Sequence, residues 1–282
     1  NIQSKLKFVM NKKPIFGILN NSKFNEKKLK SIPLIVKFLP VLDIKKIVDH
    51  LLISSLSAEK NTDTIALIMA GGFGKRLGNK TKKTPKPLLK INNNRILDII
   101  IKQLKAANFN KIYISTHYLH EKIEKYIGKK YKKLNIKILY EKSPMGTAGA
   151  IQLIRENFKN ILVINGDIIS KVNLKSLNEH HQESKNDITV TVAKYNYQIP
   201  YGIVKLTKNY GLQSINEKPI LEYNVLSGVY CLNKKACNGY LEKYIDMTTL
   251  ISNSLKLKHR IGVFPIYEYW KDIGNLKDLA SV

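Results

Sequence analysis

The feature that most constrains the fold is an apolar run that ends abruptly in a cluster of glycines. Residues 65–69 are all apolar, as in a strand buried on both faces of a parallel sheet. Gly71, Gly72 and Gly74 follow, and glycines directly after a strand let backbone N–H groups approach an anion without obstruction from side chains. Cationic side chains come shortly afterwards. The segment therefore predicts a phosphate-binding loop in an α/β protein.

Two well-known phosphate loops do not fit this spacing. A Walker A loop has glycine, four residues and then Gly-Lys-Ser/Thr, but Met69 stands where the first glycine belongs and Arg76 replaces the magnesium-binding hydroxyl. A dinucleotide fingerprint reads Gly-x-Gly-x-x-Gly, and here the third glycine, Gly78, comes one residue too late. Both interpretations are excluded.

What remains resembles the signature of the sugar-1-phosphate nucleotidyltransferases, Gly-Gly-x-Gly-x-Arg-Leu followed after a short stretch by Pro-Lys-Pro-Leu. Nine positions match: Gly71, Gly72, Gly74, Arg76, Leu77, Pro85, Lys86, Pro87 and Leu88. The resemblance covers residues 64–279 and implies transfer of a nucleotidyl group from an NTP to a sugar 1-phosphate, with release of pyrophosphate. Asn79 is a departure, because family members often carry proline there.

From residue 64 onward, strand-like and helix-like segments alternate with short connections. This pattern predicts an α/β fold with a Rossmann-like, mostly parallel sheet and helices on both faces. We expect strands at residues 65–69, 111–116, 136–140 and 161–164, and helices at 96–107, 119–127 and 148–157. The nucleotide should bind beyond the carboxyl ends of these strands.

The second half of the chain has a different pattern. Strand-like segments at residues 188–193, 202–206, 212–217 and 225–232 follow one another closely, as in antiparallel pairing. A helix near residues 248–257 and a strand at 261–264 come next. We expect this antiparallel portion to bind the sugar.

Residues 1–58 form a separate small segment, joined by a polar linker to the domain at residues 64–282. Pro40, Val41 and Asp43 resemble the Pro-Val-hydrophobic-Asp core of a CBS module. The segment is short for a CBS pair, so a partial CBS-like segment and a docking segment both remain open. For a CBS-like segment, the resemblance implies that an adenine nucleotide binds there.

The net charge of +27 raises the question of nucleic-acid binding. The lysines are spread along the whole chain and no nucleic-acid-binding motif accompanies them, so we expect no nucleic acid as partner. No apolar run approaches the roughly 18 residues of a membrane span, and we expect a cytoplasmic protein without membrane contact. His180 and His181 lie in a polar stretch, where we expect a solvated helix end.

Nucleotidyl transfer needs in-line geometry and positive charge around the phosphates. The oxygen of a sugar 1-phosphate is already ionised at neutral pH, so no protein nucleophile is needed. We assign Arg76 and Lys86 as the catalytic cations that stabilise the leaving phosphates, and the family resemblance implies the same roles. The alternative is that both are solvated surface cations.

Two aspartates are candidates for a metal site. Asp167 follows the apolar strand expected at residues 161–164, and Asp272 lies in the sequence Trp-Lys-Asp-Ile-Gly near the end. Mg²⁺ prefers carboxylates at a site shared with substrate phosphates, and the resemblance implies aspartates in these two contexts. We therefore expect Mg²⁺ as the cofactor.

The nucleotide should contact the loop and a second segment rich in small residues. The loop contributes Ala70, Gly71, Gly72 and Gly74. In the second segment we assign Glu141, Gly146 and Thr147, because the string Met-Gly-Thr-Ala-Gly-Ala resembles that of sugar-phosphate guanylyltransferases. Thymidylyltransferases more often carry Gly-Leu-Ala there, so GTP is favoured. The alternative for Thr147 is a helix N-cap.

For the acceptor, we assign Gly202, Glu217, Lys218 and Gly228, which lie in segments that resemble the sugar-pocket motifs of the family. Glu217 can accept hydrogen bonds from hydroxyls or pair with an amino group, so an amino sugar such as glucosamine 1-phosphate is one option. Lys218 can bind the acceptor phosphate. Leu226 stands where the family commonly has asparagine, which leaves the sugar open.

The sequence thus favours a magnesium-dependent sugar-1-phosphate guanylyltransferase. The alternatives are a uridylyl-, thymidylyl- or cytidylyltransferase of the same fold and a non-catalytic nucleotide sensor. The oligomeric state is open, and a homo-oligomer is compatible with every one of these functions.

Overall fold

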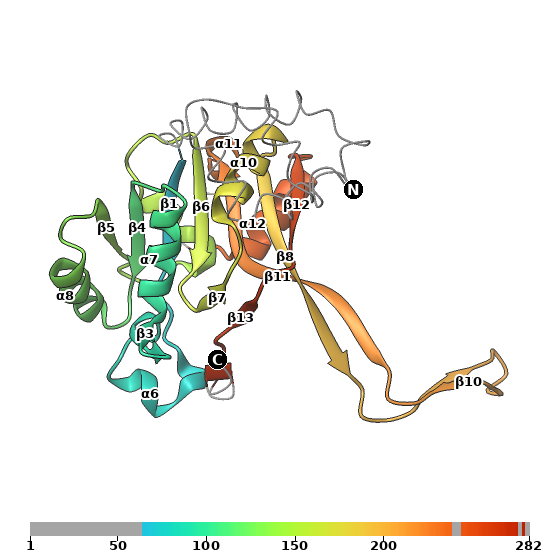
Figure 1. Cartoon of the computed structure of the whole chain (residues 1–282). Coiled ribbons are helices and arrows are strands. Elements are labelled where there is room, and N and C mark those ends of the chain that lie inside the picture. Colours follow the sequence, from blue (N-terminus) through green and yellow to red (C-terminus); the bar gives the residue numbers. More distant parts are fainter. Residues whose placement is uncertain (1–63, 239–243, 276–277, 280–282) are drawn as a thin grey trace, which may run out of the picture. The chain divides into compact units, whose positions relative to one another are not determined.

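The computed structural model describes residues 64–238, 244–275 and 278–279 (Figure 1). The CBS-like or docking segment expected at residues 1–58 lies outside the described residues, and so do its linker and its expected adenine-nucleotide site.

The described residues are organised around a seven-stranded sheet with the order β12-β8-β11-β6-β1-β4-β5 (Figure 1). Its strands in chain order are β1 (Thr64–Met69), β4 (Ile112–Thr116), β5 (Ile136–Tyr140), β6 (Asn160–Asn165), β8 (Ile188–Gln198), β11 (Ile220–Asn233) and β12 (Ile261–Ile266). Neighbours are parallel except where β11 pairs with β6 and with β8. The predicted mostly parallel sheet is confirmed, and strands of the second half extend it.

Helices cover both faces of this sheet, as predicted. Ala66 and Ile68 of β1 belong to one buried cluster, whereas Ile65 and Leu67 belong to another, because successive residues of a strand face opposite sides. The first cluster includes residues of α7 (Ile96–Ala106), α8 (His120–Lys130) and α10 (Leu174–Glu183). The second includes residues of α9 (Gly146–Gly149), α11 (Lys234–Cys237) and α12 (Met247–Lys256). Burial on both faces explains why β1 is a continuous apolar run.

The helix predicted at residues 148–157 is wrong in its bounds. The chain forms α9 and then a short 3-10 helix, η5 (Ala150–Leu153), and regular structure ends there until β6. Gly146 and Gly149 make this segment a poor helix former, because glycine loses the most backbone freedom on ordering.

The polar stretch around His181 is also different from the expectation. It forms α10, whose buried residues Leu174, Leu177, Asn178 and His181 follow the spacing of one helix face. His181 is only 1% exposed, so it is a core residue and not part of a solvated helix end. The spacing was the signal that could have revealed this helix.

Three short strand pairs complete the fold. β7 (Ile168–Ser170) pairs with β13 (Trp270–Asp272), β9 (Ile203–Leu206) pairs with β10 (Leu212–Asn216), and β2 (Lys90–Ile91) pairs with β3 (Asn94–Arg95). The β9–β10 pair lies at the end of a long ribbon that β8 and β11 form beyond the sheet (Figure 1). Short helices η3 (Lys75–Leu77), α6 (Asn79–Lys82) and η4 (Lys86–Leu88) follow β1.

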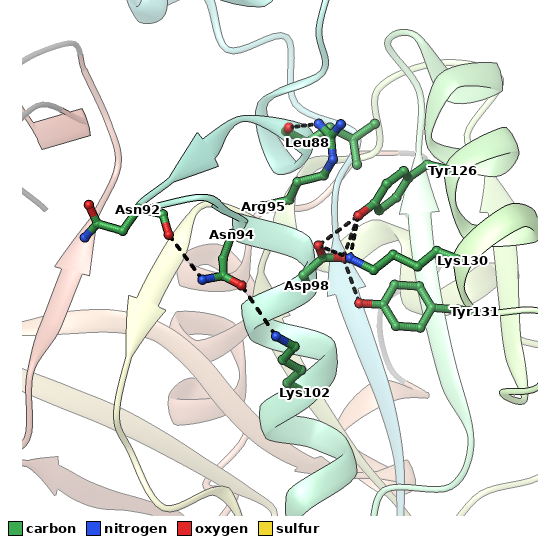
Figure 2. Close-up of polar contacts among 9 residues, drawn as sticks. All are labelled: Leu88, Asn92, Asn94, Arg95, Asp98, Lys102, Tyr126, Lys130 and Tyr131. Atoms are coloured by element: carbon green, nitrogen blue, oxygen red, sulfur yellow. Dashed lines mark hydrogen bonds and ion pairs between the residues drawn. The ribbon is translucent and has the colours of Figure 1, made fainter.

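A buried carboxylate joins α7 to α8 and to the residue that follows α8 (Figure 2). Asp98 is 3% exposed and accepts hydrogen bonds from the Tyr126 hydroxyl at 2.8 Å, the Tyr131 hydroxyl at 2.7 Å and Lys130 Nζ at 2.5 Å. Burial by itself raises the pKa of Asp98, but these three donors outweigh it and the pKa is lowered. The carboxylate is therefore charged and paired in the folded protein.

Arg95 connects this cluster to the segment that carries Lys86 (Figure 2). Its guanidinium lies over the Tyr126 ring, 4.8 Å from the centroid, and its Nη1 donates to the Leu88 carbonyl at 2.5 Å. The Ile96 N–H donates to the Leu89 carbonyl at 3.1 Å. The start of α7 thereby holds the Pro-Lys-Pro-Leu segment in place.

We expect the buried His181 to make the folded protein less stable as the pH falls. Its Nδ1 lies 2.9 Å from the Thr189 hydroxyl, and burial, together with the neighbouring His180, lowers its pKa to about 4. The histidine of an unfolded chain has a pKa of about 6.5. Between these two values only the unfolded chain takes up the proton, so the free energy of unfolding decreases on acidification.

Urea unfolding across this pH window checks the prediction. His181→Asn should show a shallower pH dependence than the wild type, by up to one proton, whereas His180→Asn, which removes only the smaller cause of the lowered pKa, should show a much smaller change. Equal slopes in all three proteins would contradict it.

Candidate active site

The glycine-rich loop is tightly folded at the end of β1. The Ala70 N–H donates to the Ser115 carbonyl at 2.9 Å. Gly74 has a φ of +63°, and a Cβ there would lie 2.9 Å from Thr81 Cγ2, so both conformation and space require glycine. The Thr81 hydroxyl donates to the Gly74 carbonyl at 3.0 Å, a contact that the sequence argument missed. A Cβ at Gly72 would meet nothing within 4 Å, so the loop borders open space there.

The two predicted catalytic cations come from η3 and η4. Lys86 is 8% exposed, and its Nζ forms an ion pair with Asp167 Oδ2 at 2.6 Å. Arg76 is exposed, but it reaches Gly274, where an added Cβ would lie 3.4 Å from Arg76 Nη1 and 3.6 Å from Asp272 Oδ2. Each cation therefore lies beside one of the two predicted metal ligands.

The two aspartates are brought together by the pairing of β7 with β13. Asp272 is the register partner of Ile168, and the Ile273 N–H donates to the Asp167 carbonyl at 3.0 Å. Burial, and then the charge of Asp167, raise the pKa of Asp272 against the opposing effects of Lys86 and Arg76. Asp272 Oδ1 is buried and has no hydrogen-bond partner among the described residues.

This pair fits a divalent cation that is shared with a substrate. A buried carboxylate oxygen without a donor, next to a second carboxylate, is an arrangement that a cation stabilises. Among the described residues no group of three or more His, Cys, Asp or Glu side chains is placed to hold a metal. The remaining ligands would therefore have to be phosphate oxygens and water, as Mg²⁺ prefers.

Glu141 contacts the glycine-rich loop from the end of β5. It is 3% exposed, and its Oε2 accepts the Met145 N–H at 3.0 Å. Its Oε1 faces Gly71, where an added Cβ would lie 2.8 Å from this oxygen. A side chain at position 71 would displace the carboxylate. The structure thus joins two of the predicted nucleotide residues in one contact.

Gly146 and Thr147 have clear structural roles next to this contact. Gly146 has a φ of +76°, and a Cβ there would lie 2.5 Å from the Ile245 carbonyl oxygen. The Thr147 hydroxyl accepts the Met247 N–H at 2.8 Å and lies 3.3 Å from Asp246 Oδ1. Thr147 therefore caps the start of α12 and not its own helix, and contact of either residue with a nucleotide stays a prediction.

The four predicted acceptor residues are divided between two places. Gly228 lies in the sheet and has a φ of +79°. A Cβ added there would lie 2.9 Å from Asn165 Nδ2, close to Asp167 and Asp272, the two aspartates that we call the metal pair. Gly202, Glu217 and Lys218 lie at the far end of the ribbon, around β9 and β10 (Figure 1). A Cβ on Gly202 would lie 2.8 Å from Glu217 Oε2, whose other oxygen is 3.8 Å from Lys218 Nζ. No contact between these three and the metal pair is found within the described residues.

The residues that position Gly228 could not be recognised from the sequence. The register of β11 against β8 shifts between Leu226 and Tyr230, and the Thr191 hydroxyl bonds to both Ser227 Oγ and the Val229 carbonyl there. Trp270 Nε1 donates to the Ser227 carbonyl at 2.8 Å. A β-bulge of this kind has no local sequence signal beyond the glycine at its centre.

Comparison with known proteins identifies the family. Residues 65–282 match the family described as nucleotidyl transferase, and the chain belongs to it. Over 214 residues it is 32% identical to a D-glycero-alpha-D-manno-heptose 1-phosphate guanylyltransferase from Aneurinibacillus thermoaerophilus, covering 74% of this chain and 92% of that protein. The predicted enzyme class, a sugar-1-phosphate nucleotidyltransferase, is confirmed.

One further relative agrees with this assignment, and one solved structure supports the fold. The chain is 27% identical to the mannose-1-phosphate guanylyltransferase catalytic subunit beta of Drosophila melanogaster, covering 77% of this chain and 61% of that protein. The crystal structure of HddC from Yersinia pseudotuberculosis complexed with GMP-PN matches with a TM-score of 0.59 and 24% identity, covering 77% of this chain and 96% of that one. The latter similarity supports the fold alone. None of the described helices is long and apolar enough to cross a membrane.

We expect Asp272→Asn to stabilise the protein when magnesium and nucleotide are absent. The substitution keeps the size of the side chain but removes a half-buried charge that Asp167 repels, so a gain of about 1 kcal/mol or less is expected. Thermal unfolding with a chelator measures it, and Glu183→Gln on the exposed side of α10 is the matched control. A lower melting temperature for Asp272→Asn would show that the repulsion does not dominate.

Proposed function

We propose that the protein transfers a guanylyl group from GTP to a sugar 1-phosphate in a magnesium-dependent reaction that releases pyrophosphate. The observation that carries this proposal is the convergence of Lys86, Arg76, Asp167 and Asp272 at the carboxyl ends of β1 and β6. Relatives with guanylyltransferase activity support the choice of nucleotide.

The chemistry follows from the charges at this site. Mg²⁺ held by Asp167 and Asp272 would neutralise phosphate charge and orient the triphosphate. Arg76 binds the leaving β- and γ-phosphates from η3, and Lys86, already oriented by Asp167, stabilises the charge that develops in the transition state. The ionised phosphate oxygen of the acceptor attacks the α-phosphorus in line, so no side chain has to act as a nucleophile.

Glu141 supports guanine among the four bases. Guanine presents an N–H and an NH₂ donor on one edge, and a carboxylate accepts from both. Glu141 is buried and its Oε2 already accepts the Met145 N–H, so Oε1, which faces Gly71, is the acceptor that a base beside the loop would use. Adenine and cytosine carry a ring nitrogen acceptor on the corresponding edge, which the same carboxylate would repel.

The sugar is the least constrained part of the proposal. The relatives act on heptose and mannose 1-phosphates. Glu217 could equally accept a hydrogen bond from the amino group of glucosamine 1-phosphate. We place the reaction in the cytoplasm. A partial CBS-like segment at residues 1–58 that binds an adenine nucleotide would be a regulatory addition to this activity.

A matrix of four NTPs against hexose, heptose and hexosamine 1-phosphates, read by pyrophosphate release with Mg²⁺, tests the activity. GTP with one of these acceptors should give turnover. Asp167→Asn and Asp272→Asn should each lose at least ~100-fold in kcat, because the phosphates lose their shared cation, while Glu183→Gln should match the wild type. Pyrophosphate release with UTP, dTTP or CTP but not with GTP would favour a uridylyl-, thymidylyl- or cytidylyltransferase. No pyrophosphate release with any pair of NTP and acceptor would favour the nucleotide sensor.

The base preference has its own test in Glu141→Gln. The change removes the charge and one of two acceptors but keeps the shape, so kcat/KM for GTP should fall by roughly 10- to 100-fold, as for a lost hydrogen bond to a charged group. The value for a poor NTP substrate should change little. An equal fall for every NTP would instead assign Glu141 to holding the loop at Gly71.

A further inference from the structure

The ribbon beyond the sheet is the most exposed apolar part of the described protein. We call residues 194–226 the arm: the outer ends of β8 and β11, with β9 and β10 between them (Figure 1). The arm holds twelve of the twenty large apolar side chains that are exposed among the described residues. Every residue of β9 and β10 is exposed, including Ile215 at 62% and Leu212 at 62%. An isolated two-stranded ribbon is marginally stable, and exposed apolar surface of this extent marks a contact site.

Buried hydrogen bonds lie at the base of the arm, where it leaves the sheet. The pairing of β8 with β11 runs from Ile188 opposite Leu232 to Gln198 opposite Ile220, and its one irregularity is the bulge before Tyr230. At that bulge, Thr191 and Ser227 are fully buried and hydrogen-bonded to each other. Trp270 Nε1 donates to the Ser227 carbonyl at 2.8 Å. These hydrogen bonds hold the two strands together at the base of the arm.

The arm also carries groups that the site in the sheet lacks. The described site has its cations and carboxylates at Arg76, Lys86, Asp167 and Asp272, but Glu217 and Lys218 lie on the arm. Both are well exposed, with side-chain accessibilities of 69% and 60%. A chain in this conformation would bind the nucleotide with an incomplete acceptor pocket.

Charge identifies the partner that suits the arm. The whole chain has a net charge of +27, which opposes association of two copies. The arm contains four lysines and two glutamates, and two of these lysines are paired: Lys194 with Glu222 at 2.6 Å and Lys218 with Glu217 at 3.8 Å. It is therefore a nearly neutral, apolar segment on a strongly basic protein. Contact through this segment buries apolar surface with little repulsion.

We propose that the arm packs against a second copy of this chain and delivers Glu217 and Lys218 to the acceptor side of that copy's metal pair. Exchange in both directions closes a two-fold dimer in which each site is built from two chains. The inference rests on the proposed function for the role of the two residues, but the dimer itself can be tested without activity.

Complementation between two inactive variants tests the shared site. The double variant Glu217→Ala/Lys218→Ala damages the arm, and Asp272→Asn damages the sheet. Each homodimer should be nearly inactive. Mixed dimers, co-expressed with two affinity tags and purified through both, should recover about half of the wild-type activity, because one of their two sites combines an intact arm with an intact metal pair.

Mixed dimers as inactive as the two parents would show that each arm serves its own site, and would overturn the proposal. Full activity of the Glu217→Ala/Lys218→Ala homodimer would overturn it as well, because the arm would then contribute nothing to the acceptor site.

Sedimentation velocity tests the dimer independently of catalysis. Ile215→Asp on the arm should shift the wild-type dimer to a monomer at micromolar concentration, whereas Leu257→Asp should not. Leu257 is an equally exposed control at the end of α12, at 60% against 62%. A monomeric wild type, or a dimer that survives Ile215→Asp, would contradict the exchange. Absence of any nucleotidyl transfer in the wild type would remove the proposed function and leave this measurement to decide on the dimer.

Discussion

The pairing of β7 with β13 is the contact on which the candidate site depends. It joins two three-residue strands from distant parts of the chain and places the Ile273 N–H on the Asp167 carbonyl at 3.0 Å. Asp272 is thereby held half-buried next to Asp167, and burial together with this like charge raises its pKa against the opposing effects of Lys86 and Arg76. A carboxylate perturbed in this way is expected where a protein is built to receive a cation and a polyanionic substrate. The glycine-rich loop and the Lys86 segment pack around this pair.

Much of this arrangement could be predicted from the sequence because its signals are local. The apolar run of β1 and the glycines after it define a strand and its loop, and Asp167 follows the equally apolar β6. Parallel strands end at one edge of the sheet, so these segments had to meet. The approach of Asp272 was implied only by family resemblance, since a three-residue strand such as β13 has no periodicity to detect.

The parts that could not be predicted depend on tertiary contacts. The base of the arm is held by the buried Thr191 and Ser227 and by the partly buried Trp270, which are far apart in the sequence. The acceptor residues Glu217 and Lys218 were therefore predicted as one pocket with Gly228, whereas the structure separates them from it. Similarly, the polar neighbours of His181 predict a solvated residue, although helix packing buries it.

The central claim is that this chain holds the phosphates of GTP for direct displacement by the acceptor, without a protein nucleophile. The stereochemical course at the α-phosphorus tests it most directly, using GTP that carries a chiral sulfur substitution there, Mg²⁺ and the acceptor that gives turnover. A single in-line displacement inverts the configuration, and inversion is the result we predict. Retention of configuration would require two displacements through a covalent enzyme intermediate, and would show that a protein nucleophile takes part.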